Sequence, residues 1–390
     1  MNWPYRYTAL SLCTLAFFGT MVARLVISPI VPDLTAEFEV SNGTVGLALS
    51  GMWVAYAFSQ FPSGVLGDRL GERTVILVAV GGTAATSAGL AVAPSFPLFL
   101  LSTVSLGAAA GLHYSVATTF LTRQFDDIGR AIGVHVAGGP LAGLLAPPAA
   151  AVVGARYGWR AAIALGAVVA VPVFVAFALS IRPTDPRRPD QPVRERFELA
   201  PLAELLSRPE IRYTTALAIV GAFTWQATAS FLPTFLAAHH GLSTTAAGVL
   251  FSVYFVVHGA SQPVLGSLSD RLSRESVVLG TMLLGIVGYG VLVVGDRPGV
   301  VLAGVLCVGV AMSWGAPLQS RFMDVLSEAE RGAGFGLVRT AYMTLGATGS
   351  VVVGTVADLV GWSASFGLLS AVMALGAAAV AGNRALGLGY

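Results

Sequence analysis

The 390-residue chain contains no lysine, only two cysteines and few charged residues of either sign. Asp, Glu, Lys and Arg make up 11% of its residues, whereas soluble domains carry about 25%. Hydrophobic residues make up 55%, and the mean hydropathy is +0.77. Such a chain has too little polar surface to cover a water-soluble globule, so it is expected to be a membrane protein. No nucleic-acid partner is expected.

Other absences narrow the class of function. Cys13 and Cys307 lie in different halves of the chain, so we expect two packing residues and no disulfide framework. The sequence shows no nucleophile–base pattern, no phosphate-binding loop and no cluster of metal ligands. We therefore predict that the protein is not an enzyme, uses no cofactor and is not driven by ATP.

Long apolar runs fill most of the chain. A helix needs about 20 apolar residues to cross a bilayer. On that basis the first run, Thr8 to Ile30, is expected to be an uncleaved first span. The predicted spans are 8–31, 44–66, 74–94, 97–121, 131–154, 159–181, 213–237, 245–268, 276–295, 299–322, 333–356 and 361–382.

Two short charged turns show that the chain contains an internal repeat. Gly64–Arg73, which reads GVLGDRLGER, has a weaker copy in Gly266–Arg274, which reads GSLSDRLSR. Asp68 and Asp270 are 202 residues apart, and the same offset pairs Gln60 with Gln262. A repeat of this length predicts two halves built alike. We expect a six-helix bundle in residues 1–181, a linker in 182–212 and a second bundle in 213–390.

The first charged turn resembles the signature loop between helices two and three of the major facilitator superfamily. This resemblance implies an all-α membrane protein with twelve transmembrane helices in two pseudo-symmetric six-helix bundles. It also implies a secondary active transporter that moves a small solute by alternating access, as a monomer. In the family the loop latches helix two against helix eleven. The gating residues carried over from the motif and its copy are Asp68, Arg69, Arg73, Asp270 and Arg271. The alternative is a solvated turn whose arginines only fix the topology.

The arginines also predict the orientation in the membrane. With the N-terminus inside, seventeen of the 22 arginines fall in cytoplasmic segments, and the outer loops hold only Arg156, Arg160 and Arg297. The excess of positive charge on one side predicts a multi-pass protein of the cytoplasmic membrane with both termini in the cytoplasm.

Arg24 is the best candidate for a solute-binding residue. A charged side chain in the middle of a bilayer costs about 2.5–3.5 kcal/mol on insertion scales, so it indicates function. Thr20, Arg24 and Ser28 follow an i, i+4, i+8 pattern and should form one polar stripe facing a watery cavity. The position of Arg24 is similar to that of the first-helix arginine in anion transporters of the superfamily. The competing interpretation is an arginine that snorkels to the membrane surface.

Further candidates follow from polar residues inside predicted spans and from the repeat. Arg339 is a binding-site candidate, and the alternatives are that it snorkels to the cytoplasmic surface or makes a structural contact with the Asp68 turn. Histidines can carry protons near neutral pH, but a histidine inside a membrane is commonly a packing residue. The remaining solute-binding candidates are Trp53, Tyr56, Gln60, Gln226, Tyr254, His258, Gln262 and Trp314, and the proton-coupling candidates are His113, His135 and His258.

The charged residues inside the predicted spans indicate whether the solute is an anion or a cation. No Asp or Glu lies near the middle of a predicted span, since Asp33, Asp324 and Asp358 stand at helix ends. Many exporters of cationic drugs in the superfamily rely on such a carboxylate. A cavity with arginine and histidine instead favours an organic or inorganic anion, coupled to protons or to another ion.

Two alternative functions stay open. Gly138–Gly143, which reads GGPLAG, resembles the antiporter motif of proton-coupled exporters of hydrophobic compounds, although a tightly packed helix needs similar residues. Thr103 stands where those exporters have an arginine, which argues against this alternative. The other alternative is a non-transporting membrane sensor on the same scaffold.

Overall fold

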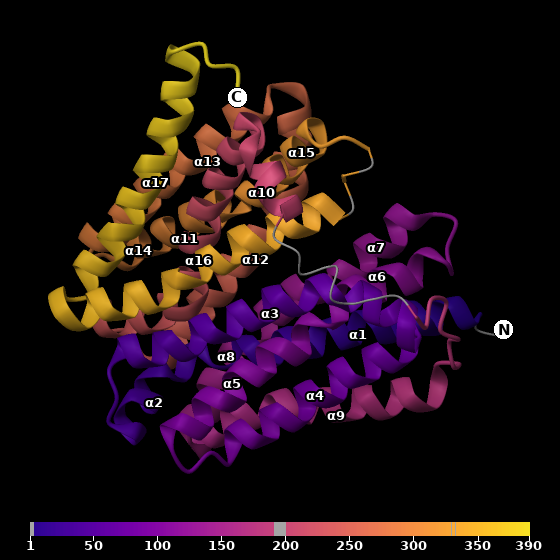
Figure 1. Ribbon diagram of the computed structural model, residues 1–390. Helices are drawn as coiled ribbons and strands as arrows, with labels where there is room; N and C mark the ends of the chain where they lie inside the picture. Colours follow the sequence, from indigo (N-terminus) through magenta and orange to yellow (C-terminus); the bar gives the residue numbers. More distant parts are fainter. Residues whose placement is uncertain (1–3, 191–199, 329, 332) are drawn as a thin grey trace. The chain divides into compact units, whose positions relative to one another are not determined.

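The computed structural model describes residues 4–190, 200–328, 330–331 and 333–390, and within them it contains helices and no strand (Figure 1). The chain divides into two compact units. Unit 1 comprises Met1–Glu39 and Gly51–Phe197, and unit 2 comprises Val40–Ser50 and Glu198–Tyr390. One long helix, α3 (Asn42–Leu70), therefore contributes to both.

Unit 1 is built around the packing of α1 and α4 on α9. Its core is formed by apolar side chains of different sizes such as Ala16, Val80 and Phe177, all at most 1% exposed. Its helices besides α3 are α1 (Tyr5–Leu25), η1 (Ser28–Ile30), α2 (Val31–Phe38), α4 (Glu72–Ala91), α5 (Phe96–Gly111), α6 (His113–Thr122), α7 (Ile128–Val136), α8 (Gly138–Tyr157) and α9 (Trp159–Ser180).

Unit 2 is built around α11 packed on α16, with α13 packed on α14 and α17. Large side chains that are fully buried here include Tyr254, Tyr289 and Phe366. Its helices are α10 (Ala200–Ser207), α11 (Pro209–His240), α12 (Thr244–Arg271), α13 (Arg274–Val294), α14 (Pro298–Ala311), η3 (Met312–Trp314), α15 (Gly315–Val325), α16 (Ala333–Val360) and α17 (Trp362–Ala385).

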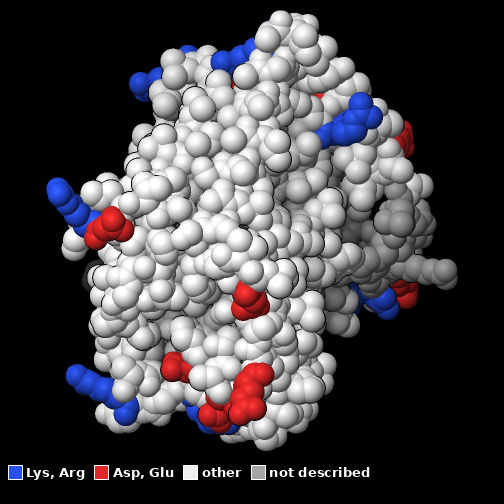
Figure 2. Space-filling view, turned by 90° about the vertical axis from the view of Figure 1, so that its left-hand side faces the viewer, with Lys and Arg blue, Asp and Glu red and all other residues white. Residues whose placement is uncertain are grey.

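The expected fold class, an all-α membrane protein, is confirmed. Eleven helical segments in the described part of the chain are long and apolar enough to cross a membrane, and α3 is a further helix of 29 residues. In the face shown in Figure 2, charged side chains are few and scattered over a mostly uncharged surface.

Four predicted spans are interrupted, which the sequence prediction did not include. The first ends at Leu25 and continues as η1 and α2 around Pro29, and the fourth is divided between α5 and α6 at Leu112. The fifth is divided between α7 and α8 at Ala137, and the tenth is interrupted by η3. Ser313 inside η3 has non-helical backbone angles, φ −82° and ψ 15°.

Glycines at equivalent positions bring the same helices together in both halves. A Cβ atom on Gly107 of α5 would collide with the backbone of Met52 on α3, and one on Gly309 of α14 would press on Val257 and the Tyr254 carbonyl on α12. Gly107 and Gly309 are 202 residues apart, as are Met52 and Tyr254. The sequence repeat therefore corresponds to a repeated backbone contact.

The first turns of α3 pack on α16 inside unit 2. Asp358 accepts hydrogen bonds from the backbone N–H groups of Asn42, at 3.1 Å, and Gly43, at 2.7 Å, and from the Asn42 side chain, at 2.8 Å. Asp358 thus caps the N-terminus of α3. The Ser50 hydroxyl donates to the Ala347 carbonyl at 2.6 Å and accepts from the Val351 N–H at 3.0 Å.

The predicted linker, 182–212, contains the short helix α10, and Leu205 of α10 is buried. Residues 191–199 of the linker, with Arg194 and Arg196, lie outside the described residues. Near the linker, Arg208 forms an ion pair with Glu330 at 3.0 Å. The Ser327 N–H and hydroxyl, together with Arg208, lower the pKa of Glu330 to about 2, so this carboxylate stays ionised at any physiological pH.

Candidate functional site

Arg24 lies in the last turn of α1 and is buried, with 2% of the side chain exposed. Its Nε donates to the Thr20 carbonyl at 3.1 Å, and one terminal nitrogen contacts the Met21 sulfur at 2.8 Å. The guanidinium carbon lies 4.1 Å from the centre of the Tyr56 ring and 5.2 Å from the Trp53 ring. Arg24 therefore does not snorkel to the surface, because its head group is enclosed by aromatic side chains of α3.

Close helix packing positions these two aromatic residues. Trp53 and Tyr56 are one turn apart on α3, and their side chains are 3% and 6% exposed. Gly107 and Gly111 of α5 contact the α3 backbone at Met52 and Tyr56, where a Cβ atom would collide with the carbonyl groups. Glycine at both positions lets α5 hold α3 at a fixed distance, so the rings have a defined place beside Arg24.

Arg24 has no acidic partner in the described part of the chain. None of the eight ion pairs found there involves it. A guanidinium group has five N–H donors, and the hydrogen bonds to Thr20 and Met21 use only part of this capacity. A buried cation without a counter-charge is costly, so this group is suited to receive an anion.

Gln60 adds an unsatisfied amide one turn after Tyr56 on α3. Its side chain is 8% exposed, and neither the amide oxygen nor the amide nitrogen has a hydrogen-bond partner among the described residues. Buried polar atoms nearly always have a partner in native proteins. Gln60 therefore provides a donor and an acceptor that a bound molecule can use.

The polar stripe predicted on the first span is only partly correct. Thr20, Arg24 and Ser28 are all buried, at 1%, 2% and 3% exposure. Thr20 and Arg24 share a face of α1, but α1 ends at Leu25 and Ser28 begins η1. Pro29, in the second position of η1, has no N–H to continue the helix. The helical spacing that grouped Ser28 with Arg24 therefore does not hold beyond Leu25.

In unit 2 the predicted face of Tyr254, His258 and Gln262 on α12 is present. The Tyr254 and His258 rings are parallel with centres 6.1 Å apart, and the His258 Nε2 lies 3.4 Å from the Gln262 amide nitrogen. Ser313 of η3 donates to the His258 carbonyl at 2.9 Å and lies 3.3 Å from its Nδ1. The Tyr254 hydroxyl is buried without a hydrogen-bond partner among the described residues.

The other unit 2 candidates have mainly structural contacts. Gln226, equivalent to Arg24 in the repeat, is 1% exposed and donates to the Met343 carbonyl at 3.1 Å. The Trp314 indole lies flat against Gly221 of α11, at a point where any larger residue would collide with it. Arg339 is half-buried on α16 and acts on the neighbouring Tyr342 through an electrostatic interaction.

The two histidines of unit 1 lie next to each other. His113 begins α6, His135 lies near the end of α7, and their ring centres are 5.5 Å apart. Both are fully buried, and Phe17 of α1 contacts both rings. The sequence identified these residues separately but offered no reason to place them together.

The first charged turn is tied to the segment that follows α9. The Asp68 carbonyl accepts from the N–H groups of Arg187 and Arg188, at 2.8 and 3.0 Å, and Arg69 donates to the Pro189 carbonyl at 3.2 Å. Arg73 donates to the Ile181 and Ala178 carbonyls at 2.8 and 2.6 Å. These contacts give the turn a fixed structure within unit 1.

Acidic side chains of the same turn pair with the end of α6. Glu72, whose side chain is 2% exposed, forms an ion pair with Arg123, and Arg123 also lies 4.0 Å from Asp68. Pairing with Arg123 explains how a carboxylate can be almost completely buried.

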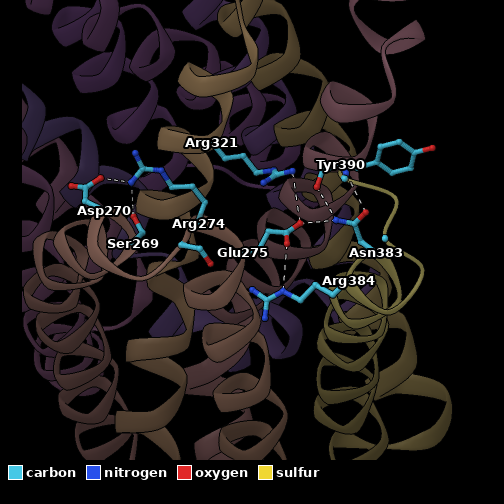
Figure 3. Close-up of a pocket in the computed structure, with 11 residues that line it drawn as sticks. Ser269, Asp270, Arg274, Glu275, Arg321, Asn383, Arg384 and Tyr390 are labelled. Atoms are coloured by element: carbon cyan, nitrogen blue, oxygen red, sulfur yellow. Dashed lines mark hydrogen bonds and ion pairs between the residues drawn. The ribbon is translucent and has the colours of Figure 1, made fainter.

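The second charged turn has its own network in unit 2 (Figure 3). Arg274 pairs with Asp270 and, at 3.0 Å, with Asp324 at the end of α15. On the other side of a pocket of ≈ 680 Å³, Glu275 lies 3.8 Å from Arg321 and 3.4 Å from Arg384. Arg271, by contrast, has no ion pair among the described residues.

The structure also clarifies the glycine-rich stretch of the fifth span. A Cβ atom on Gly138 would collide with the Thr14 carbonyl of α1, and one on Gly139 would press on Phe17. Pro140 lies in the first turn of α8, where its missing N–H costs little. These residues let α8 pack closely on α1, which supports the packing interpretation of this motif.

Several residues of the site were missed by sequence reasoning. Ser313, Phe17 and Arg123 each contact a predicted candidate, and Glu72 pairs with Arg123. Of these, only Glu72 and Arg123 carried a usable signal, because charged residues beside predicted spans must find partners. Serine and phenylalanine are too common in apolar spans to stand out.

Comparison with known proteins identifies the class of the chain. The model of the family described as Major Facilitator Superfamily matches residues 13–243 and 214–384. Similar curated proteins include a probable nitrate transporter, NarT, of Staphylococcus haemolyticus (strain JCSC1435), 23% identical with 84% of each chain covered. NarT of Staphylococcus aureus (strain JH9) is 22% identical, with 91% of this chain and 90% of the relative covered.

Solved structures with the same fold are more distant in sequence. A bacterial homologue of the human lysosomal transporter Spinster, in an inward-facing and unoccupied conformation, has a TM-score of 0.84 at 16% identity, with 97% of each chain covered. The nucleoside transporter NupG has a TM-score of 0.80 at 15% identity, covering 98% of this chain and 99% of NupG. The human organic anion transporter MFSD10 (TETRAN) has a TM-score of 0.69 at 17% identity, covering 97% and 100%.

Proposed function

Because the chain belongs to the Major Facilitator Superfamily and is a secondary transporter of a small solute, we propose that its solute is a small inorganic anion such as nitrate, bound at Arg24. The single observation that carries the proposal is a buried guanidinium without a carboxylate partner in the described residues. The relatives named as nitrate transporters support the same class of solute.

The geometry around Arg24 suits a small, planar anion. An arginine fork binds two oxygen atoms of one anion through parallel N–H groups, which gives both affinity and orientation. The Tyr56 and Trp53 rings hold the guanidinium by cation–π contact without neutralising its charge. The unsatisfied amide of Gln60, on the same face of α3, is a further donor for an anion oxygen.

A test of the proposal compares arginine variants in proteoliposomes. The purified protein is reconstituted into vesicles loaded with unlabelled nitrate, and uptake of ¹⁵N-nitrate by counterflow is measured. Truncating one partner of a buried charge pair costs about 2–5 kcal/mol, so Arg24→Ala should lower uptake at sub-saturating nitrate at least about 30-fold. Arg24→Lys keeps the charge but loses the fork, so we expect an intermediate loss of about 10-fold.

Arg156→Ala is the matched control. Arg156 is exposed in the last turn of α8, so its removal should leave counterflow unchanged. Wild-type rates of nitrate counterflow in Arg24→Ala would remove Arg24 from the site. Exchange of lipophilic cations but of no anion by the wild-type protein would contradict the proposal and support the exporter alternative.

The exporter and sensor alternatives have weaker support. The glycine-rich stretch of the fifth span is accounted for by packing on α1, and Thr103 is buried and bonded to the Phe99 carbonyl at 2.7 Å. The curated relatives are named as transporters, which favours transport over sensing.

The proposal includes the orientation and the gating residues. We place both termini in the cytoplasm, because most arginines then lie on the cytoplasmic side. We assign gating to Asp68, Arg69, Arg73, Asp270 and Arg271, by the resemblance of the two charged turns. The contacts of Arg73 with the end of α9 hold the first of these turns in place within unit 1.

A further inference from the structure

The His113–His135 pair lies where two spanning segments are interrupted. His113 directly follows the interruption at Leu112 between α5 and α6, and His135 precedes the one at Ala137 between α7 and α8. Both imidazoles are 0% exposed, and their ring planes meet at 54°. Two titratable side chains from different spans are thus in contact, away from solvent.

None of the four ring nitrogens has a hydrogen-bond partner among the described residues. The Cys13 carbonyl is close enough to act electrostatically on both rings, but it lies outside hydrogen-bond geometry. Leaving a buried polar group unsatisfied costs about 1–3 kcal/mol. A phenylalanine at either position would avoid that cost, so packing alone does not account for two histidines here.

The groups facing the pair are almost all uncharged. Phe17 and Cys13 face it from α1, and the Tyr114 ring of α6 is stacked on His135 with centres 6.0 Å apart. No carboxylate in the described residues forms an ion pair with either histidine. Arg24 acts electrostatically on His113 of the pair.

Arg24 connects the pair to the proposed anion site. It lies seven residues after Phe17 on α1, which is two helical turns or about 10 Å on the same face. A proton on the pair adds a second positive charge near Arg24, which is unfavourable until an anion neutralises the guanidinium. Anion binding and protonation therefore promote each other, and this coupling is reciprocal.

We infer that His113 and His135 together bind one proton, which is transported with the anion held by Arg24. This inference rests on the proposed function. A hydronium ion gives its proton to one ring nitrogen, so an O–H bond breaks and an N–H bond forms. The proton later returns to water on the other side by the reverse exchange. The two rings lie with their centres 5.5 Å apart, so a proton held by either ring is next to the other.

The experiment measures proton movement and anion binding in the same proteoliposomes. A pH-sensitive dye is enclosed, the membrane potential is clamped with valinomycin and potassium, and nitrate is added outside. The wild-type protein should acidify the lumen, with one proton per nitrate, and its apparent affinity for nitrate should rise as pH falls.

His113→Phe and His135→Phe keep an aromatic ring among Phe17 and Tyr114 and remove only the nitrogens, which have no partner to lose. In both variants we expect nitrate-driven proton uptake at least tenfold below wild type, a pH-independent nitrate affinity, and nitrate counterflow within about twofold of wild type at alkaline pH. His239→Phe is the control, because His239 also stacks on a phenylalanine, Phe235, at 5.0 Å. It should behave as wild type.

The outcomes separate this inference from the proposed function. Nitrate counterflow without proton movement in the wild-type protein would overturn the inference and leave anion transport standing, whereas absence of counterflow for every anion would remove both. Wild-type proton uptake in either variant, or loss of counterflow in a variant that stays monodisperse, would also overturn it. If the variants do not fold, the inference is tested by nitrate binding to the wild-type protein. An affinity that does not rise as pH falls would overturn it.

Discussion

Arg24 shows how far one residue can be interpreted from sequence and where the structure is required. An arginine inside an apolar span is costly, and this cost, with the polar stripe and the resemblance to anion transporters, makes it a candidate. Its aromatic enclosure by Trp53 and Tyr56 comes from another helix, 29 and 32 residues further along the chain. No local pattern encodes such a contact, because it depends on how α3 packs on α5.

The contact between Arg24 and Tyr56 yields a prediction at this scale. The ring lies 4.1 Å from the guanidinium carbon and holds the group in place. Cation–π contacts contribute about 0.5–2 kcal/mol, so Tyr56→Leu should weaken nitrate affinity in counterflow by about 2- to 30-fold. Tyr56→Phe keeps the ring and removes only the hydroxyl, which also interacts with Arg24, so its loss should be smaller. Equal effects of the two substitutions would show that the ring face has no role.

The histidines show that sequence can select a candidate residue but cannot predict which residue it contacts. His113 and His135 were candidates because of their chemistry, as was His258. Only the structure shows that the first two are in contact and that His258 is instead bonded to Ser313 and adjacent to Gln262. A lone histidine in an apolar run gives no information on its partner, because the contact is made between helices.

At the scale of helices, the positions of the spans could be predicted but their interruptions could not. Apolar length locates a span within a few residues, as for α9, predicted at 159–181 and observed at Trp159–Ser180. The divisions at Leu112 and at η3 contain no proline. They lie at equivalent places in the repeat, Leu112 and Trp314 being 202 residues apart. They depend on packing between helices rather than on local sequence.

The cap of α3 gives a prediction at the scale of helices. Asp358 of α16 binds the N–H groups of Asn42 and Gly43, which is a capping interaction supplied from another helix. Such caps contribute about 1 kcal/mol. Asp358→Ala should therefore lower the midpoint of thermal unfolding in detergent by about 2–4 °C.

The control for this prediction is Glu328→Ala. Glu328 is an exposed carboxylate in the turn after α15 and has no hydrogen bond or ion pair among the described residues. Its removal should leave the midpoint unchanged. An equally small shift for Asp358→Ala would mean that water replaces the carboxylate at the start of α3.

At the scale of the whole molecule, the repeat was the most informative feature of the sequence. It indicated two similar halves from the charged turns alone, and the equivalent contacts of Gly107 and Gly309 bear this out in the backbone. The polar residues of the two halves are less alike. Gln226 takes the place of Arg24, so the candidate anion site is a property of one half only.

The ion pairs beside the two charged turns yield a prediction at this scale. Glu72 and Arg274 occupy equivalent positions, but the Glu72 side chain is 2% exposed, whereas Arg274 and its partner Asp324 are 24% and 54% exposed. Breaking a buried pair costs about 3–5 kcal/mol, and an exposed pair contributes about 0–1 kcal/mol. Glu72→Gln should reduce thermal stability and yield strongly, while Arg274→Gln should change them little. Similar losses in both variants would contradict this difference.

The opposite signs of these pairs have a consequence for how a duplicated chain assembles. In the first half, the acidic Glu72 on the turn pairs with the basic Arg123 at the facing helix end. In the second half the signs are reversed, because the basic Arg274 on the turn pairs with the acidic Asp324, one residue from the position equivalent to Arg123. If a turn met the helix end of the wrong half, Glu72 would face Asp324 and Arg274 would face Arg123. Like charges brought together at an interface cost several kcal/mol. Packing of a turn on the helix end of the wrong half is therefore less stable than packing within its own half.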